Sequence, residues 1–212
     1  MFGKVKTIKF GKYIQGKKIF GKDIKTPIEW YILDKKDNKY LLLSKYCLVG
    51  KEYNDKEEPV TWEKSSLRYW LNNEDDINNS FILNAFSDEE EKKIVTTKLL
   101  NNANSDFNVE GGNETFDKIF ILSVDEYNKY LKNNVMKYAA PTKYLLEKNH
   151  IYVVEDYKTN YGEASTFWRL RTPGYNSITT MVVTPDGVLY PYSGYVKTEK
   201  GPLRVALWIN LY

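Results

Sequence analysis

The chain contains one cysteine and one histidine, the residue types that most often supply nucleophiles and metal ligands. His150 lies in Lys-Asn-His-Ile, which has neither a nucleophile elbow nor another pattern typical of a catalytic triad, so we expect an exposed turn histidine. Cys47 lies in an apolar segment, residues 40–49, which indicates a buried and inert thiol. One Cys and one His cannot provide the four or so ligands of a conventional zinc site, and a single cysteine excludes an intramolecular disulfide.

Carboxylates are the other side chains that could do chemistry. The acidic runs at 55–58, 74–76 and 88–91 are typical of solvated loops and a helix start, rather than of the paired acids of a hydrolase. Residues Glu110–Asp117 combine several oxygen ligands with two glycines, so calcium binding there stays open as a minor hypothesis, although the spacing differs from an EF-hand. We therefore expect no catalytic residue, no resident metal and no cofactor.

Aromatic side chains are abundant, at 15% of the chain with 18 tyrosines. Most should pack the core and the sheet surfaces, where Tyr and Trp combine a large area with one polar group. In the last third, however, tyrosines gather around predicted turns and close to an arginine. Tyr rings give broad contact at low conformational cost, and Asn supplies adaptable hydrogen bonds. The candidate ligand-binding residues are Arg171, Tyr175, Asn176, Tyr190, Tyr192 and Tyr195.

Both ends of the chain are predicted to form strands, because apolar residues alternate with polar ones or form short runs there. The first third contains predicted strands at residues 5–10, 28–33 and 39–43, the last two joined as a hairpin by the polar turn 34–38. The last third contains predicted strands at residues 167–170, 179–183, 188–192 and 203–211. The sequence Pro185-Asp186-Gly187 between two apolar runs predicts a hairpin turn.

The middle of the chain is predicted to be helical. Ser87 with Glu90, and Ser123 with Glu126, have the spacing of capping boxes, which mark helix starts. Helices are predicted over residues 61–72, 88–94, 124–131 and 143–147. Residues 97–114 are rich in Asn and Gly and predict a long loop, whereas residues 118–122 predict a buried strand.

Charge and hydropathy exclude several partners. The net charge is only +3, from 31 basic and 28 acidic residues. The one mild concentration of lysines, at the start of the chain, alternates with apolar residues, as on solvent-facing strands. That concentration comprises Lys4, Lys6, Lys9, Lys12, Lys17, Lys18, Lys22 and Lys25. We therefore expect no nucleic acid as partner.

Without an apolar run of 18 residues or a signal segment, we expect no membrane insertion, and a cytoplasmic or phage-associated origin is slightly favoured. The oligomeric state stays open.

Three sequence blocks together resemble one bacterial family. They are Ser-Leu-Arg-x-Trp-Leu-Asn at 66–72, Asp-Lys-Ile-Phe-Ile-Leu-Ser at 117–123 and Leu-Arg-Thr-Pro-Gly at 170–174. From about Ile8 to Leu211 the chain resembles domain-of-unknown-function family 6273, which is similar to C-type-lectin-like domains and, more distantly, to formylglycine-generating sulfatase-modifying enzymes. The resemblance implies an α+β fold in which the chain termini meet in one sheet, short helices flank it, and a loop-rich face over a second sheet binds ligands.

Two departures from the family pattern stand out. Residues 202–206 keep the arginine of the usual Gly-Val-Arg-Pro-Ala ending but move the proline, and Trp168-Arg169 replaces the usual aromatic pair. The fold should tolerate both. The chemistry of sulfatase-modifying enzymes needs a reactive cysteine pair, so the single cysteine argues against that activity.

Arginines recur in the matched blocks at Arg68, Arg171 and Arg204. Each could clamp a ligand, but the favoured interpretation is that each guanidinium is buried against a carboxylate or loop carbonyls, with Asp117 as one partner.

The sequence therefore predicts one C-type-lectin-like α+β domain over residues 1–212. Its predicted function is non-catalytic recognition of a glycan or a protein surface through an aromatic loop face. Two alternatives stay open. One is a structural or assembly module of a bacterial surface or phage-related protein. The other is an enzyme that uses carboxylate or arginine chemistry in a cleft.

Overall fold

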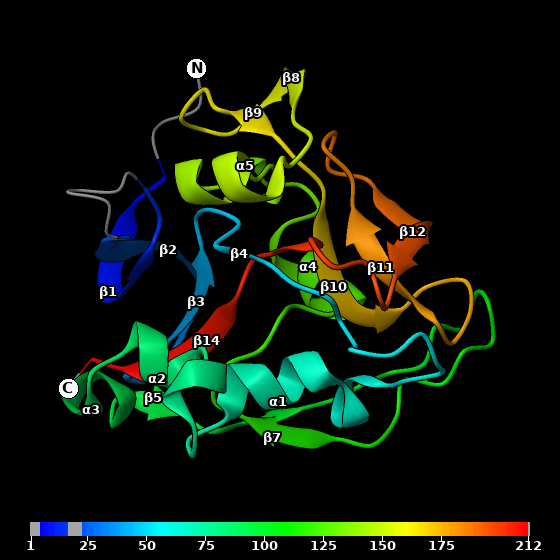
Figure 1. The fold of residues 1–212 in the computed structure, drawn as a ribbon, viewed down its shortest axis with the longest axis horizontal. Coiled ribbons are helices and arrows are strands. Elements are labelled where there is room, and N and C mark those ends of the chain that lie inside the picture. Colours follow the sequence, from blue (N-terminus) through cyan, green and yellow to red (C-terminus); the bar gives the residue numbers. More distant parts are fainter. Residues whose placement is uncertain (1–4, 17–22, 212) are drawn as a thin grey trace.

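The computed structural model describes residues 5–16 and 23–211, and the protein is a mixed α/β structure of mostly antiparallel strands with short helices (Figure 1). The first and last strands lie in one five-stranded sheet, at the left of Figure 1. Its order is β1 (Thr7–Ile14), β2 (Lys25–Lys36), β3 (Lys39–Ser44), β14 (Ala206–Asn210) and β5 (Ile94–Val95). Both terminal strands belong to this sheet, as predicted, but they do not pair with each other, because β2 and β3 lie between β1 and β14.

A second sheet stands at the right of Figure 1 and consists of β10 (Trp168–Pro173), β11 (Thr179–Val183) and β12 (Leu189–Tyr195), in that order. Every residue of β11 is buried, whereas the edge strand β12 leaves four of its seven residues exposed. The predicted hairpin turn is confirmed, because the Thr184 amide donates to the Val188 carbonyl at 2.8 Å and Gly187 takes a positive φ of 77°. Such a φ suits glycine, which has no Cβ to clash.

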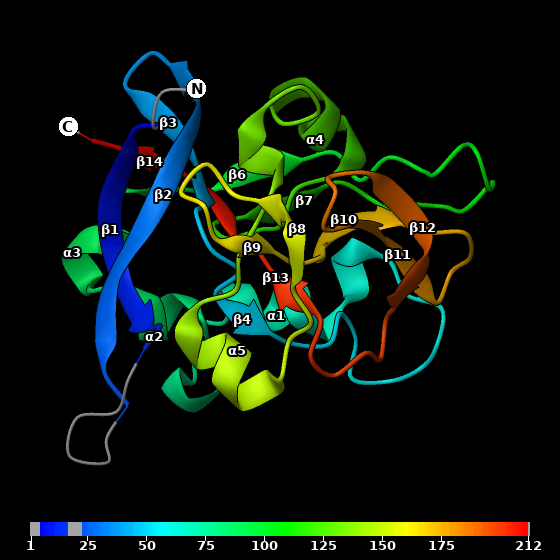
Figure 2. The same cartoon turned by 90° about the horizontal axis from the view of Figure 1, so that it is seen from above.

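Three two-stranded ladders complete the strands (Figure 2). They pair β4 (Val49–Gly50) with β13 (Pro202–Leu203), β6 (Thr97–Leu99) with β7 (Thr115–Asp117), and β8 (Val154–Lys158) with β9 (Ala164–Ser165). Two predictions need correction. The predicted loop at 97–114 begins with β6, and the predicted strand at 203–211 is divided at Arg204, whose side chain turns into the core and donates to the carbonyls of Ser44 and Met136.

The helices predicted from residues 88, 124 and 143 begin there, but the first two end earlier than predicted and the third ends later. The described helices are α1 (Ser66–Asn72), α2 (Ile82–Ala85), α3 (Asp88–Glu91), α4 (Val124–Tyr130) and α5 (Lys143–Asn149), with 3-10 turns at Trp62–Lys64, Ile77–Asn79 and Val135–Lys137. Both predicted capping boxes are present. The helix predicted over 61–72 is divided at Ser65, whose hydroxyl caps α1, and α3 stops before Ile94, which instead pairs with Ile209 in the sheet.

Residues 118–122 are almost entirely buried but do not form the strand predicted for them, since Phe120 makes only an isolated bridge to Ala206. The core around them is one connected cluster in which Trp30, Trp62 and Trp168 are fully buried. No helix within the described residues is long and apolar enough to span a membrane.

The lysines predicted to face solvent do so at Lys6, Lys9, Lys12 and Lys25, which are all exposed. Lys4, Lys17, Lys18 and Lys22 lie outside the described residues.

The arginines pair as the structural interpretation predicts, although the Arg68 side chain stays 29% exposed. Arg68 Nε donates to Asp117 at 2.7 Å, and the buried Asp117 also accepts from Trp62 Nε1 at 2.8 Å. Arg204 is fully buried, with the centre of its guanidinium 5.0 Å from the Trp168 ring. Burial is the main reason that the pKa of Arg204 falls to about 10, so the guanidinium stays charged at neutral pH.

Candidate functional site

An aromatic cluster covers the edge strand β12. Tyr190 and Tyr192 lie two residues apart and therefore share one face of the strand, with ring centroids 5.5 Å apart. Tyr192 is the centre of the cluster, because Phe107 and Tyr175 also place their rings 5.7 and 5.2 Å from it. Tyr192 nevertheless keeps 48% of its surface exposed. The name aromatic cluster is used below for five residues: Phe107, Tyr175, Tyr190, Tyr192 and Tyr195.

Tyr195 joins the cluster because β12 is irregular. Between the pairs Val182↔Tyr190 and Thr180↔Gly194, two steps along β11 match four steps along β12. Extra residues of this kind bend an edge strand and redirect its side chains. The Tyr195 hydroxyl thereby lies 3.5 Å from that of Tyr175, and this hydrogen bond is the first cause of the raised pKa of Tyr195.

The turn after β10 holds Tyr175 in place. The Tyr175 amide donates to the Pro191 carbonyl at 3.2 Å. A Cβ at Gly174 would lie 2.4 Å from that same carbonyl oxygen, so the turn can approach β12 only with glycine at this position. The last residue of the Leu-Arg-Thr-Pro-Gly block thus sets the distance between Tyr175 and the strand.

Phe107 comes from the loop between β6 and β7, which is fixed to the turn after β10. Asn104 is 8% exposed, and its side-chain amide donates to the carbonyls of Pro173 and Gly174 at 2.9 and 3.2 Å. Asn104 also closes the tip of the loop through a bridge with Val109, and its carbonyl accepts from the Phe107 amide at 3.3 Å. Phe107 is therefore held by backbone bonds next to Tyr192.

Arg171, one of the predicted ligand-binding residues, lies beneath the surface. It is 3% exposed and forms an ion pair with Glu126 at 2.5 Å. Its guanidinium also donates to the Leu100 and Ile121 carbonyls and to the Asn101 side chain. Arg171 therefore contacts the base of the loop that carries Phe107, and its donors face protein acceptors rather than the aromatic cluster.

Asn176 lies next to the cluster but uses its side-chain oxygen locally. Asn176 Oδ1 accepts from the Ile178 amide at 3.1 Å and from the Thr179 hydroxyl at 3.0 Å, which shapes the turn before β11. The structure therefore brings together Tyr175, Tyr190, Tyr192 and Tyr195, places Asn176 at their margin, and leaves Arg171 underneath.

Two grooves flank the cluster, and Phe107 lines both. One, of about 540 Å³, lies between the residue 59–64 segment and the turn of Tyr175 and Asn176. The other, of about 690 Å³, lies between the residue 102–107 segment and α4. Each contains charges of both signs. Lys64 and Glu110 line the first groove, and Lys132, Asp106 and Asp125 line the second.

The groups that could support catalysis are dispersed. His150 is exposed at the C-terminus of α5, and Cys47 is fully buried, where desolvation raises the pKa of its thiol to about 12. Both placements confirm the sequence interpretation. In the candidate calcium loop, Asp117 is bound by Arg68, and Glu114 pairs with Lys98 at 2.7 Å. Across residues 5–16 and 23–211, no three His, Cys, Asp or Glu side chains gather as a metal site would require.

Sequence reasoning missed Phe107 and Asn104. Both lie in the Asn- and Gly-rich segment that predicted only a loop, and a single phenylalanine in such a segment has no periodicity to reveal its neighbours. The available signal was Phe107 itself, a large apolar residue in an otherwise polar stretch.

These features define an α/β protein with a preformed aromatic surface on a small second sheet. The chain belongs to the family described as a domain of unknown function, DUF6273, whose model matches residues 37–211. The match covers β3, β14 and β5 of the five-stranded sheet but not β1 and β2, and it includes all the helices described above and the whole aromatic cluster. No curated protein and no solved structure matches the chain.

Proposed function

We propose that this protein is a non-catalytic recognition module that binds a glycan or a protein ligand through the aromatic cluster. The observation that carries the proposal is the exposure of three adjacent tyrosines, Tyr190, Tyr192 and Tyr195, at 42–48% on one edge strand. Large aromatic rings at a surface are enriched where proteins bind partners, because each ring gives much contact area and one polar hydroxyl.

Preorganisation supports the proposal. Every ring of the aromatic cluster contacts another ring or is hydrogen-bonded to one, and the backbone of Tyr175 and of Phe107 is tied down by hydrogen bonds. A ligand that binds there does not have to order the side chains first, which removes a cost of roughly 0.5–1.5 kcal/mol for each immobilised side chain.

The chemistry of the grooves favours a hydroxyl-rich or amide-rich ligand. The grooves carry side-chain amides and hydroxyls beside the rings, including Asn102, Asn128 and Thr172 in the larger groove and Asn176 in the smaller. Such groups both donate and accept, as sugar hydroxyls and peptide groups require. A nucleic acid is disfavoured, because acidic side chains line both grooves and would repel phosphates.

The fold is the second element of the proposal. We propose a C-type-lectin-like domain over residues 1–212, since both terminal strands belong to one sheet and the loop-rich second sheet carries the exposed rings. An experimental structure whose nearest structural neighbours lie outside that class would contradict this assignment.

A glycan array and an affinity pull-down test the function. The wild type is compared with the double variant Tyr192→Ala, Tyr195→Ala and with the control Tyr69→Ala, Tyr152→Ala, whose rings are 58% and 70% exposed outside the cluster. We expect the cluster variant to lose affinity about tenfold or more, as central aromatic contacts do, and the control to bind like the wild type. A confirmed ligand that binds both variants equally would refute the assignment of the face.

A further inference from the structure

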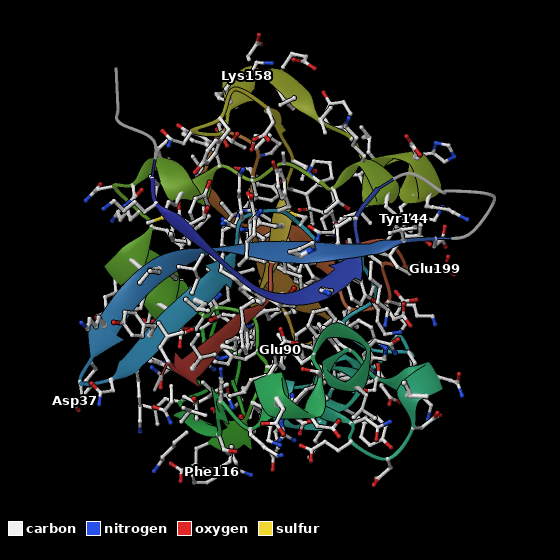
Figure 3. The ribbon with its side chains drawn as sticks, turned by 90° about the vertical axis from the view of Figure 1, so that its left-hand side faces the viewer. Asp37, Glu90, Phe116, Tyr144, Lys158 and Glu199 are labelled. Atoms are coloured by element: carbon white, nitrogen blue, oxygen red, sulfur yellow. The ribbon has the colours of Figure 1, made fainter. Side chains whose placement is uncertain are left out.

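A separate cavity of about 370 Å³ lies where α5, the β8–β9 hairpin and the end of β1 meet. In Figure 3, Lys158 on the β8–β9 hairpin stands at the top of the molecule, and Tyr144, on α5, lies lower and at the right. Much of the wall is apolar and comes from Ala140, Pro141, Leu146, Val153 and Ala164. None of these residues lines the grooves beside the aromatic cluster.

A half-buried carboxylate, Glu163, belongs to this apolar wall. Tyr46 Oη donates to Glu163 Oε1 at 2.5 Å, and the Thr159 hydroxyl donates to Glu163 Oε2 at 2.5 Å. Both donors are neutral, so they orient the carboxylate without cancelling its charge. In the part of the chain that the structure describes, no Lys or Arg side chain forms a salt bridge with Glu163.

Two lysines on segments that border the cavity are already paired. Lys45 Nζ is 3.0 Å from Glu29 and lies 3.6 Å from the centre of the Tyr161 ring. Lys158 pairs with Glu155, the other carboxylate that lines the cavity. Lys143 lines the cavity too, but it is exposed at the start of α5 and so is well solvated. The cavity thus combines apolar walls with an oriented carboxylate, Glu163, that forms no salt bridge within the described residues.

We propose that this cavity binds a primary alkylammonium group. The ammonium donates to the free lone pairs of Glu163, and the aliphatic chain packs against Pro141, Leu146 and Val153. A charged donor is favoured over a neutral one, because a hydrogen bond between two ions is roughly twice as strong as a neutral bond. The volume is near the lower limit for small-ligand pockets, so it suits a chain of a few carbons, supplied either by a free amine or by a lysine side chain.

Isothermal titration with n-pentylamine tests the proposal, with 1-pentanol and pentanoate as probes of equal chain length. The variant Glu163→Gln keeps an acceptor for Tyr46 but removes the charge. The matched control is Glu155→Gln, since Glu155 lines the same cavity but is paired with Lys158. A second variant, Leu146→Trp, fills the cavity from a residue that is 39% exposed, so it tests the site independently of Glu163.

We expect pentylamine to bind with a dissociation constant on the order of 1 mM, and pentanol and pentanoate to bind at least about tenfold more weakly. Glu163→Gln and Leu146→Trp should each lower pentylamine affinity about tenfold or more, and Glu155→Gln should leave it nearly unchanged. Equal binding of pentanol and pentylamine, unchanged binding by folded Glu163→Gln, or no saturable binding to the wild type would overturn the proposal. Tighter binding of Nα-acetyl-lysine amide than of pentylamine would assign the natural ligand to a lysine side chain, and the reverse would assign it to a free amine.

Discussion

Replacing Arg171 by alanine should destabilise the protein more than the loss of any surface ion pair. The guanidinium is 3% exposed, and its partner Glu126 is 24% exposed. Glu126 Oε2 also accepts from the Ser123 amide in the capping box of α4, so the carboxylate cannot turn away to solvent without loosening that helix. The substitution therefore leaves a partly buried carboxylate without its counter-charge.

The magnitude follows from what is left unpaired. Removing one partner of a buried ion pair costs about 3–5 kcal/mol. The carbonyls of Leu100 and Ile121 lose a donor as well, and each buried acceptor left unpaired costs about 1–3 kcal/mol. Because Glu126 is partly solvated and these losses are not additive, we expect about 3–5 kcal/mol in total. For a protein of this size, that corresponds to a Tm lowered by roughly 6–20 °C.

Urea unfolding followed by tryptophan fluorescence measures the change. The matched control is Lys92→Ala, which removes an ion pair with Glu89 whose side chains are 69% and 82% exposed and which should contribute less than about 1 kcal/mol. Arg171→Lys keeps the charge but loses the planar fork, so its stability should fall between those of the wild type and the alanine variant. An alanine variant within about 1 kcal/mol of the wild type would show that the buried ion pair contributes no net stability and would refute this reasoning.

Three further outcomes can be measured on the unliganded protein. Gly11→Ala should destabilise it by more than about 1 kcal/mol in urea titrations, because Gly11 has a φ of 68° and a Cβ there would lie 2.6 Å from the Phe86 ring. Burial opposes ionisation of Glu90, but backbone hydrogen bonds from Ser87 and Gly11 hold its folded pKa below the ordinary value. Its contribution to stability should therefore be complete above the ordinary pKa of a glutamate, about 4.3, and be lost as the pH falls through the lower pKa of the folded state. Glu90→Gln should flatten that part of a stability–pH curve. Cys47 should react with a thiol reagent at neutral pH only at the rate of unfolding, since it is fully buried and its thiol pKa is raised to about 12; rapid stoichiometric labelling of folded protein would disprove this.

Much of the fold could be predicted because its signals are local. The capping boxes at Ser87 and Ser123 form within one turn of chain, and the hairpin turn at Gly187 depends on residues that are adjacent in sequence. Element ends were less accurate, because they depend on distant partners. Ile94 leaves the helical pattern to pair with Ile209, and no window around Ile94 contains that information.

The candidate site was predicted in part for the same reason. Tyr190 and Tyr192 share a face by simple strand alternation, so their neighbourhood follows from the sequence. Phe107 reaches them through a long loop held by Asn104, and such a contact has no periodic signature. For Arg171 the sequence allowed two roles, because an arginine close to tyrosines in sequence fits a ligand clamp as well as a buried anchor, and the structure shows the buried anchor.

Two buried arginines of β10, Arg169 and Arg171, thus fix the geometry of the aromatic cluster above them. Arg169 is 2% exposed and donates to the carbonyls of Gly194 and Tyr195 at 2.8 and 2.9 Å. Two residues further along β10, Arg171 holds the base of the loop that carries Phe107. One strand therefore fixes both flanks of the cluster through guanidinium groups that never reach the surface. Arg169 donates only to neutral carbonyls and a hydroxyl, and its buried Nε has no hydrogen-bond partner, whereas Arg171 balances a carboxylate. The two arginines therefore differ in the electrostatic cost of their burial although both position the cluster.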